Sequence, residues 1–501
     1  MMFLYGVNRA ASCVNLDCCH TMKTSRDFVS NVLNELIMKT RTYFTSVIAA
    51  LLVSCIGSAS AQSESGQERP GLVLKDVPVK TAVPAQAPSS YSRFIDPVNG
   101  LTADEVVRYA LRNNGELQAA RQMIAEARGR LRQAGLRPNP MVEGSYGRAA
   151  NTSDNNTMVG AQIPLELGGR REARVAVASR ELVMREAEVA DFERKLAAEV
   201  RMKYAEVIAA GRNLKFTEDL LALTRDSHRL VQARVERGKS APLEQNLVLV
   251  EVNRVDAMRI NFESRVEVAM FDLKKTAGMA PSEPLRLRGD FEIDSQPIPQ
   301  SEAVRNALST RPDLLAARAA EELALAQIEQ ARVEGKVDAS IFANYMRQNM
   351  GFGVRGFNEA GQLAPVQGIF HYLTFGVQVT LPVRNKNQGN IEAAQASLEA
   401  ARNRRQFGEI VVRNEVAAAY ARFERARAAL AVYRDGVRGQ AMNNLEVIRQ
   451  TYEFGQKSLL DFVSEQRRFI EVETGYTDAL KEYLESLIEI KRAAGAPVPT
   501  A

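Results

Sequence analysis

The chain has 501 residues, enough for several domains, and its 65 Lys plus Arg nearly balance 60 Asp plus Glu, which leaves a formal charge of +5. This near balance argues against a nucleic-acid-binding protein, which would carry a strongly basic face. A hydrophobic content of 46% is ordinary for a packed protein. The chain has no run of about 18 or more apolar residues, so no membrane-spanning helix is predicted.

The N-terminal part of the chain has the pattern of an export signal. Residues 1–37 lack that pattern, and we interpret them as upstream translation, with a natural extension as the alternative. From Met38, the basic start MKTR and the apolar run YFTSVIAALLVS lead to Ala59-Ser60-Ala61. This order of basic, apolar and small residues predicts a secretory signal peptide over 38–61.

All the cysteines fall in or before this signal. Leu52-Val53-Ser54-Cys55 has the form of a lipobox, so lipidation of Cys55 is an alternative to cleavage after Ala61. The other three cysteines lie upstream of Met38. The exported chain therefore has no cysteine, or a single lipidated one, and we expect neither a disulfide framework nor a zinc site.

A flexible lead-in is predicted at 62–100, which is rich in Pro, Ser and Gln. Order is expected to start at Leu101. The next residues, Thr102-Ala103-Asp104-Glu105, match a capping box, in which the threonine caps a helix and the glutamate reaches back to it.

From there the sequence runs twice. The offset between matching segments is 197 residues at the first pair (105 to 302) and 217 at the last (276 to 493). The matching pairs are EVVRYALRNNGELQAAR (105–121) with EAVRNALSTRPDLLAAR (302–318), VGAQIPL (159–165) with FGVQVTL (375–381), VRMKYAE (200–206) with VAAAYAR (416–422), RGKSAPLE (237–244) with FGQKSLLD (454–461), and TAGMAP (276–281) with AAGAPV (493–498). These matches predict a tandem duplication. Its parts are a first repeat at 101–278, a linker at 279–300, a second repeat at 301–495 and a tail at 496–501.

Each repeat is expected to read helix, strand, loop, strand, very long helix, sharp turn and long helix. The strands are predicted at about 141–148 and 157–165, and at about 337–346 and 371–382, because apolar and polar residues alternate there. The polar segment 149–156 and the Gly-rich segment 348–369 are expected to be the loops that join them.

The long helices carry a heptad pattern with one step of four residues at the same place in both repeats. The positions are Val175, Leu182, Val189, Leu196, Val200, Val207, Leu214 and Leu221 in the first repeat, and Ile391, Leu398, Val412, Val416, Phe423 and Leu430 in the second. Heptads specify coiled-coil packing, and a four-residue step unwinds it locally. A helix of about 65 residues would be roughly 100 Å long.

Strands of about ten residues with one apolar face suit the wall of an outer-membrane barrel. Four strands cannot close a barrel, and an open edge in lipid leaves backbone groups unpaired. Three copies would supply twelve strands, an even number. The predicted fold class is therefore mainly α with a small β part: a trimer whose barrel continues into a long helical coiled-coil barrel.

This layout resembles the outer-membrane efflux protein family, the TolC-like channels, over about 101–495. The segments QIPLELGGRREA (162–173), QVTLPVRNKNQGNIEAAQA (378–396) and YEFGQKSLLDFVSEQ (452–466) carry the resemblance. It implies a homotrimer in the bacterial outer membrane with its helical barrel in the periplasm, a periplasmic adaptor protein and an inner-membrane pump as partners, and no cofactor. LPVRNKNQGNI looks most like members that export heavy-metal cations.

The two helix-reversal turns are the candidate functional site. Gly238 and Gly455 suit the left-handed backbone of a helix end. By resemblance, the periplasmic tip, where the adaptor docks and the channel narrows, is formed by Gly238, Leu243, Glu244, Tyr452, Gly455, Lys457, Leu459, Leu460 and Asp461. Glu244 and Asp461 match each other, and threefold symmetry would make each a ring of carboxylates that favours cations. Lys457 or Tyr452 is expected to bond Glu244 and hold the entrance shut.

Other motifs carry no chemistry in this context. GFGVRG (351–356) would have to open a helix in a parallel unit to bind a dinucleotide, and RGKS (237–240) lacks the leading glycine of a phosphate loop. His20, His228 and His371 share no ligand spacing, and His371 is expected at a membrane interface. No triad or carboxylate pair indicates an enzyme, and no metal site is expected.

The leading hypothesis is the passive outer-membrane exit duct of a tripartite efflux system. One alternative is the same duct serving type I protein secretion. The other is a periplasmic coiled-coil scaffold without a pore.

Overall fold

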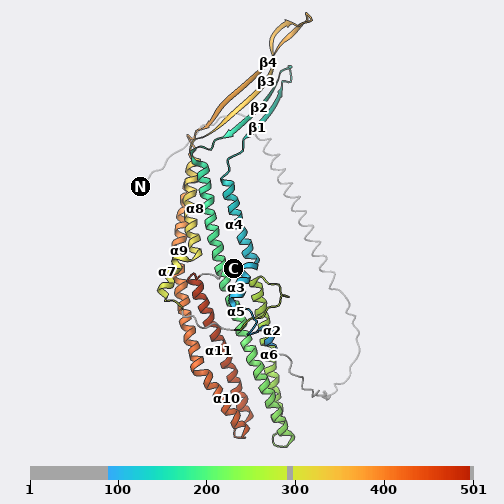
Figure 1. Ribbon diagram of the computed structural model, residues 1–501, viewed down its shortest axis with the longest axis vertical. Coiled ribbons are helices and arrows are strands. Elements are labelled where there is room, and N and C mark those ends of the chain that lie inside the picture. The colour runs from blue at the N-terminus through green and yellow to red at the C-terminus, as the bar shows by residue number, and fades with distance from the viewer. Residues whose placement is uncertain (1–88, 290–296, 497–501) are drawn as a thin grey trace, which may run out of the picture. The chain divides into compact units, whose positions relative to one another are not determined.

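The computed structural model describes residues 89–289 and 297–496, which are mainly helical with one small antiparallel sheet, as predicted (Figure 1). The elements are α2 (Tyr91–Phe94), α3 (Ala103–Asn113), α4 (Gly115–Ala134), β1 (Met141–Arg148), β2 (Asn155–Pro164), the 3-10 turn η1 (Leu167–Gly169), α5 (Arg170–Glu236), α6 (Pro242–Ala277), α7 (Gln300–Thr310), α8 (Pro312–Glu334), β3 (Asp338–Phe357), β4 (Leu363–Thr380), α9 (Gln388–Val432), the π-helix η2 (Tyr433–Val437), α10 (Arg438–Glu453) and α11 (Leu459–Ala493). No helix in these ranges is both long and apolar enough to cross a bilayer.

Several predicted segments fall outside the described residues. These are the upstream segment 1–37, the signal peptide 38–61 with Cys55, the lead-in up to residue 88, and the tail beyond residue 496. Within the described part, regular structure begins at Tyr91 rather than at Leu101. Ile95 and Leu101 both form a bridge with Leu287, whose side chain is fully buried. The end of the lead-in and the start of the linker therefore contribute to the core.

The first helix of each repeat is two helices, where sequence predicted one. The break lies at Asn114 between α3 and α4, and at Arg311 between α7 and α8, and both residues have extended backbone. Pro312 explains the second break, since a proline disfavours helical backbone in the residue before it. At the first break, the Asn114 side chain accepts a hydrogen bond from Leu117 N and starts a new helix. The predicted capping box of Thr102 and Glu105 is confirmed.

The strands form one sheet in the order β1-β2-β3-β4, with every neighbouring pair antiparallel (Figure 1). Two hairpins, β1–β2 and β3–β4, join through pairing of β2 with residues 340–349 of β3. β1 and β4 are the edges, and within the described residues neither pairs with a further strand.

The second hairpin is longer than sequence predicted. β3 continues to Phe357 and β4 starts at Leu363, so the expected loop 348–369 is wrong except for the short turn between the strands. The glycines there weaken the alternating side-chain pattern, but the backbone groups still pair across the ladder. A register shift between Gly351 and Arg355 accommodates the extra residues of β3. GFGVRG thus lies within a strand and does not join two strands.

The long first-repeat helix matches its prediction. α5 is one helix of 67 residues that packs against α6, α8 and α11. Most predicted heptad positions in both repeats are buried, namely Val189, Leu196, Val200, Val207, Leu214, Leu221, Leu398, Val412, Val416, Phe423 and Leu430. The two largest cores lie between the helices of one repeat each, whereas Leu221 clusters with Ile470 of the second repeat.

The corresponding helix of the second repeat is interrupted by η2, which sequence did not predict. Leu430 and Leu445 are both buried and lie 15 residues apart, one more than two heptads. A single π-turn holds one extra residue, so it returns Leu445 to the packed face. Gly436 and Gly439, both poor helix formers, lie in and just after this turn.

Candidate functional site

The two predicted turns have the same backbone geometry. Gly238 and Gly455 are in the left-handed region, with φ of +69° and +76°. In the first turn, Lys239 N donates to Arg234 O at 2.8 Å. In the second, Gln456 N donates to Thr451 O at 2.9 Å. This bond over six residues is a Schellman cap, which requires the left-handed glycine before its donor.

The turns lie together at one end of the helices. Arg234, in the last turn of α5, donates from Nη2 to Glu453 O at the end of α10, at 3.1 Å. A small apolar core from both hairpins holds this end together; its buried members are Val231, Val248, Leu445, Leu459, Phe462 and Val463. We call the residues 231–248 and 445–463 the tip.

Tyr452 is the half-buried centre of the tip. Its ring stacks on Phe462 with centroids 5.9 Å apart, and the Arg234 guanidinium lies 6.0 Å from its centroid. Within the described residues its hydroxyl has no hydrogen-bond partner. Burial, followed by the negative charge of Glu244, raises the pKa of Tyr452, and Arg234 partly opposes this rise. The expected bond from Tyr452 to Glu244 is therefore not formed within the described part of one chain.

Glu244 and Asp461 occupy equivalent positions but differ in their bonding. Asp461 completes a capping box with Ser458, whose hydroxyl and backbone N both donate to its carboxylate, and these bonds lower its pKa. At α6 the capping residue is Ala241, which has no side-chain hydrogen bond to give. Within the described residues, no hydrogen bond or ion pair joins Glu244 to Lys457. No other hydrogen bond or ion pair among the described residues involves the Glu244 carboxylate, which is the free carboxylate of the pair in this part of the chain.

The tip also exposes large apolar side chains. Leu243 and Leu460, at equivalent positions in the two turns, are 66% and 70% exposed. Leu459 is buried in the tip core, so its side chain is not at the surface of one chain. Sequence reasoning missed two tip residues. Phe454 is 81% exposed, and its position as an aromatic residue directly before the turn glycine could have indicated it. Nothing in the sequence marked Arg234.

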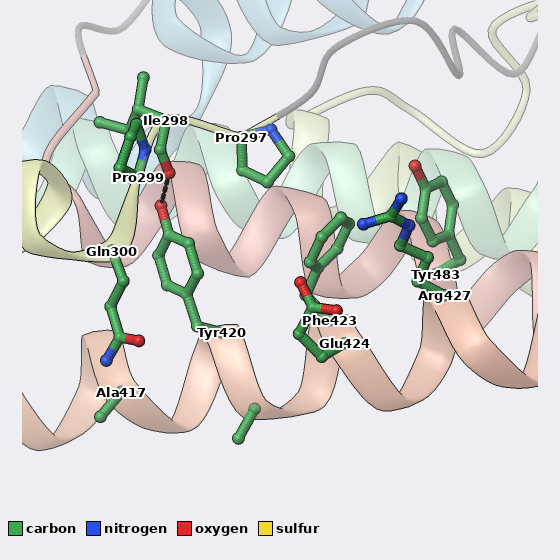
Figure 2. Close-up of a pocket in the computed structure, with 11 residues that line it drawn as sticks. Pro297, Ile298, Pro299, Gln300, Ala417, Tyr420, Phe423, Glu424, Arg427 and Tyr483 are labelled. Carbon is green, nitrogen blue, oxygen red and sulfur yellow. Dashed lines mark hydrogen bonds between the residues drawn. The ribbon is translucent and has the colours of Figure 1, made fainter.

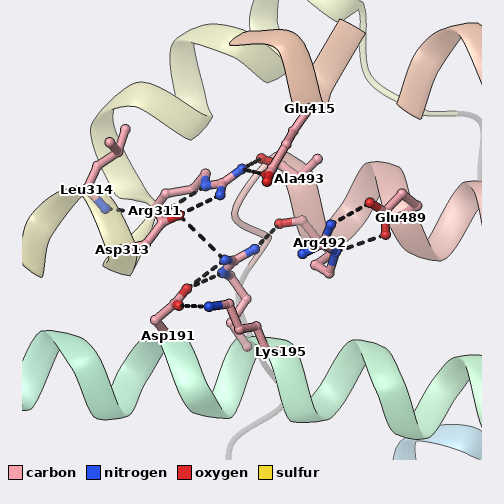
Figure 3. Close-up of polar contacts among 10 residues, drawn as sticks. Asp191, Lys195, Arg311, Asp313, Leu314, Glu415, Glu489, Arg492 and Ala493 are labelled. Atoms are coloured by element: carbon pink, nitrogen blue, oxygen red, sulfur yellow. Dashed lines mark hydrogen bonds and ion pairs between the residues drawn. The ribbon is translucent and has the colours of Figure 1, made fainter. Parts of the chain in front are cut away.

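A second polar site joins the repeats. We call it the junction cluster: Asp191, Arg194, Arg311, Asp313, Glu415 and Arg492, of which Figure 3 labels all but Arg194. Arg311 donates to Asp313 at 2.5 Å and to Glu415 at 2.7 Å. Arg194, from α5, bonds Asp191 at 2.6 Å.

Both buried arginines also cap α11. Arg194 Nη1 donates to Arg492 O at 2.6 Å and Arg311 Nη1 donates to Ala493 O at 3.2 Å. Burial alone would raise the pKa of Asp313, but its hydrogen bond and charge contact with Arg311 outweigh burial, and the pKa is lowered. Positive side chains at the negative end of α11 also match the helix dipole.

An open hollow of about 720 Å³ lies beside the start of α7 (Figure 2). Tyr420 closes one side and donates to Ile298 O. Burial raises the pKa of Tyr420, and Glu302 adds to this rise. Glu424 and Arg427 give the rest of the lining mixed charge. The side chains that line the hollow are not arranged in a way that would select one kind of ligand. Among the described residues, no group of three His, Cys, Asp or Glu side chains could hold a metal ion.

Comparison with known proteins gives consistent results. A sequence model of the family "Outer membrane efflux protein" matches residues 106–279 and 303–496. The cobalt-zinc-cadmium resistance protein CzcC of Cupriavidus metallidurans is 22% identical over 396 residues, which are 79% of this chain and 90% of that protein. The nickel-cobalt-cadmium resistance protein NccC of Alcaligenes xylosoxydans xylosoxydans is 24% identical over 253 residues, 48% of this chain and 50% of that protein.

Solved structures share the fold. CusC, a protein described in terms of transmembrane channel formation, has a TM-score of 0.65 at 17% identity and covers 82% of this chain and 97% of its own. The open-state MtrE outer membrane channel of Neisseria gonorrhoeae has a TM-score of 0.62 at 19% identity and covers 87% of this chain and 98% of its own. At such identities the likeness shows the fold alone.

Proposed function

The chain belongs to the outer membrane efflux protein family, and on this premise we propose that three copies form the passive exit duct of a tripartite pump for heavy-metal cations. The family places the protein in the outer membrane and is one of channel proteins rather than enzymes. The trimer, the pump partners and the cargo are the proposed parts.

The open sheet carries the proposal. In the described part of the chain, β1 and β4 both present unpaired edges, and the β4 face with Phe375, Val377 and Val379 is apolar and exposed. An apolar face favours lipid, but unpaired backbone groups in lipid cost several kcal/mol each. Pairing of β4 with β1 of the next copy removes both edges. Three copies then close a barrel of twelve strands.

The helices continue this wall into the periplasm. α5 follows β2 and α9 follows β4, so each hairpin leads directly into a long helix. The contacts at the two helix breaks support the proposed duplication. Asn114 Nδ2 donates to Thr276 O at 3.0 Å near the end of α6, and Arg311 makes the matching bond to Ala493 O of α11.

The tip is the proposed docking and gating end. Exposed Leu243 and Leu460 offer an adaptor protein an apolar contact from each repeat. The Glu244 carboxylate is free among the described residues of one chain, and three copies around an axis would form a ring that attracts cations. A bond from Lys457 to Glu244 would then have to join neighbouring copies. The predicted tip residues Gly238, Leu459 and Asp461 serve this end by shaping its turns and core.

The names of the relatives support the proposed cargo. CzcC, named for cobalt, zinc and cadmium resistance, aligns with 79% of this chain. Transport needs no tight ligand set, because ions pass through a wide water-filled duct. A free acidic ring at the narrow end would suit cations better than anionic or neutral cargo.

A deletion strain tests the function. Loss of the protein should lower the tolerated concentrations of cobalt, zinc and cadmium salts, and the wild-type gene should restore them. A panel of dyes and antibiotics, together with a profile of secreted proteins, runs in parallel. Unchanged metal tolerance with loss of a secreted protein would replace efflux by protein secretion. Fractionation away from the outer membrane, without heat-modifiable migration, would favour a poreless scaffold.

A further inference from the structure

The sheet separates its charged residues by face. Directly paired residues share a face, and successive residues alternate, so the register assigns every strand residue. The face with Phe375 carries the basic residues Arg148, Arg347, Arg355 and His371. The opposite face carries the acidic strand residues Glu143 and Asp338. Within the four strands, no acidic residue lies on the Phe375 face.

The basic residues begin where the apolar band ends. Along β4 and the residue after it, the outward positions from Leu381 back to Leu373 are all apolar, and His371 follows. Arg347 pairs with His371, and Thr157 and Tyr146 complete the same row across the sheet. The ten steps from 381 to 371 span about 33 Å along a strand, or about 25 Å in height at the usual tilt. This equals the height of a lipid-facing apolar band.

This row stands at the extracellular rim. The long helices start from the other end of the strands, after Pro164 and Thr380. If the helices occupy the periplasm, Arg347 and His371 face the outer leaflet. Arg148 lies one row farther out, in the row of Asn155 and Asn349.

Two of these basic residues, Arg148 and Arg347, are unpaired within the part of the chain that the structure describes. Within residues 89–289 and 297–496, no hydrogen bond or ion pair involves the side chain of Arg148 or Arg347. His371 Nδ1 is 2.7 Å from the Tyr345 hydroxyl, and their rings stack at 6.0 Å. The carboxylate of Asp154, in the nearby turn, instead accepts from Gly351 N at 2.7 Å.

We propose that Arg148, Arg347 and His371 bind the phosphate groups of lipopolysaccharide in the outer leaflet. This rests on the proposed function, because it requires the Phe375 face to contact lipid. A guanidinium fork matches a phosphate in two hydrogen bonds, and its low hydration suits a membrane interface. Tyr345 holds the imidazole beside Arg347, and Tyr146 adds an aromatic of the kind that lines such interfaces. Within the four strands, the Phe375 face itself offers no carboxylate to compete for the arginines.

The test measures lipopolysaccharide binding to purified trimers in detergent, by native mass spectrometry and fluorescence titration. The double variant Arg148→Gln/Arg347→Gln should bind about 25-fold more weakly, since a basic residue near an anionic surface contributes about a fivefold factor. The variant Arg148→Lys/Arg347→Lys keeps the charges and should retain most of the affinity. Arg384→Gln removes one exposed positive charge beyond the opposite end of β4; it is the control and should bind as the wild type.

The lipid source is tested with the same proteins. Lipopolysaccharide stripped of its lipid A phosphates should bind the wild type and the double glutamine variant equally. The double glutamine variant and Arg384→Gln should bind phosphatidylglycerol with equal affinity. Equal lipopolysaccharide affinity of these two variants would overturn the proposal. The proposed function would still stand if the wild-type protein forms pores in planar bilayers. A wild-type protein that forms no pore in planar bilayers would instead defeat the proposed function.

Discussion

Equivalent residues of the two repeats have different roles at the tip. Asp461 is held by Ser458 in a capping box, whereas Ala241 has no hydroxyl to hold Glu244, whose carboxylate has no bonded partner among the described residues. A carboxylate that already accepts two hydrogen bonds is a weaker ligand for passing cations. We therefore expect Glu244, rather than Asp461, to set the cation preference of the tip.

Exchanging the capping residues tests this difference. Ser458→Ala should speed amide hydrogen exchange in the first turn of α11 about fivefold, because a lost cap costs about 1 kcal/mol. Ala241→Ser creates the pattern Ser-x-x-Glu with Glu244 and should slow exchange at the start of α6. Hydrogen-exchange mass spectrometry reads both turns in one experiment. Faster exchange at α6 in Ala241→Ser would contradict the assignment.

The junction cluster predicts a dependence of stability on pH. The folded pKa of Asp313 lies below its usual value because Arg311 outweighs burial. Its stabilising contribution is therefore complete above the unfolded pKa of about 4, and is lost as pH falls through the folded pKa. Asp313→Asn should lower the free energy of unfolding by about 1–2 kcal/mol at pH 7.

Thermal unfolding in detergent between pH 7 and pH 3 measures this effect. The deficit of Asp313→Asn should begin to shrink below about pH 4, where the unfolded wild-type chain binds a proton that the folded carboxyl, with its lowered pKa, does not yet bind. Asp226→Asn is the control, because Asp226 pairs with Arg229 at the surface and such pairs contribute little. A deficit that stayed constant down to pH 3 would exclude an electrostatic origin.

Among the elements, the two long helices of the repeats differ most. α5 is continuous, whereas α9 and α10 are separated by η2. The π-turn places Tyr433 against α11, where the absence of a side chain on Gly475 makes room for its ring. The interruption is thus fixed by packing between helices and adds one residue to the heptad path.

Substituting the glycines near η2 separates packing from helix propensity. A Cβ at Gly475 would lie 2.6 Å from the Tyr433 hydroxyl oxygen, so Gly475→Ala should destabilise by about 1–3 kcal/mol. Gly439→Ala meets no atom within 4 Å and should stabilise by up to about 1 kcal/mol. Thermal unfolding followed by circular dichroism shows whether each variant is more or less stable than the wild type. Stabilisation by Gly475→Ala would show that Tyr433 is not confined there.

At the scale of the whole molecule, neighbouring strand residues should differ sharply in their tolerance of charge. Phe375 lies on the apolar face and Thr374 on the other. Phe375→Lys places a charge in lipid and should lower the stability of the folded barrel by about 2–4 kcal/mol, the cost near the bilayer centre. The amount of heat-modifiable oligomer in outer-membrane fractions should therefore decrease.

Thr374→Lys is the matched control. Its side chain faces the proposed lumen, on the side of Asn344, so assembly should persist while cation conductance in planar bilayers decreases. Equal loss of the oligomer in both variants would contradict a lipid-facing wall. A reversed pattern would mean that the two faces had been assigned the wrong way round.

The sequence by itself determined the element types, because side-chain periodicity depends only on local geometry. Alternation gave the strands of both hairpins, and heptads gave α5 and the packed positions of α9. The turn glycines and the Thr102 cap were also readable, since each needs one residue type at one backbone conformation. The resemblance to the efflux proteins came from the same local patterns in order.

Only the tertiary structure decided which residues meet across long chain separations. It paired β2 with β3, extended β3 through a glycine segment, and placed the π-turn beside Gly475. It also brought Arg194 and Arg311 together at the end of α11 and left Glu244 free. Backbone pairing and the packing of distant helices set these features, and neither leaves a periodic signal in the local sequence.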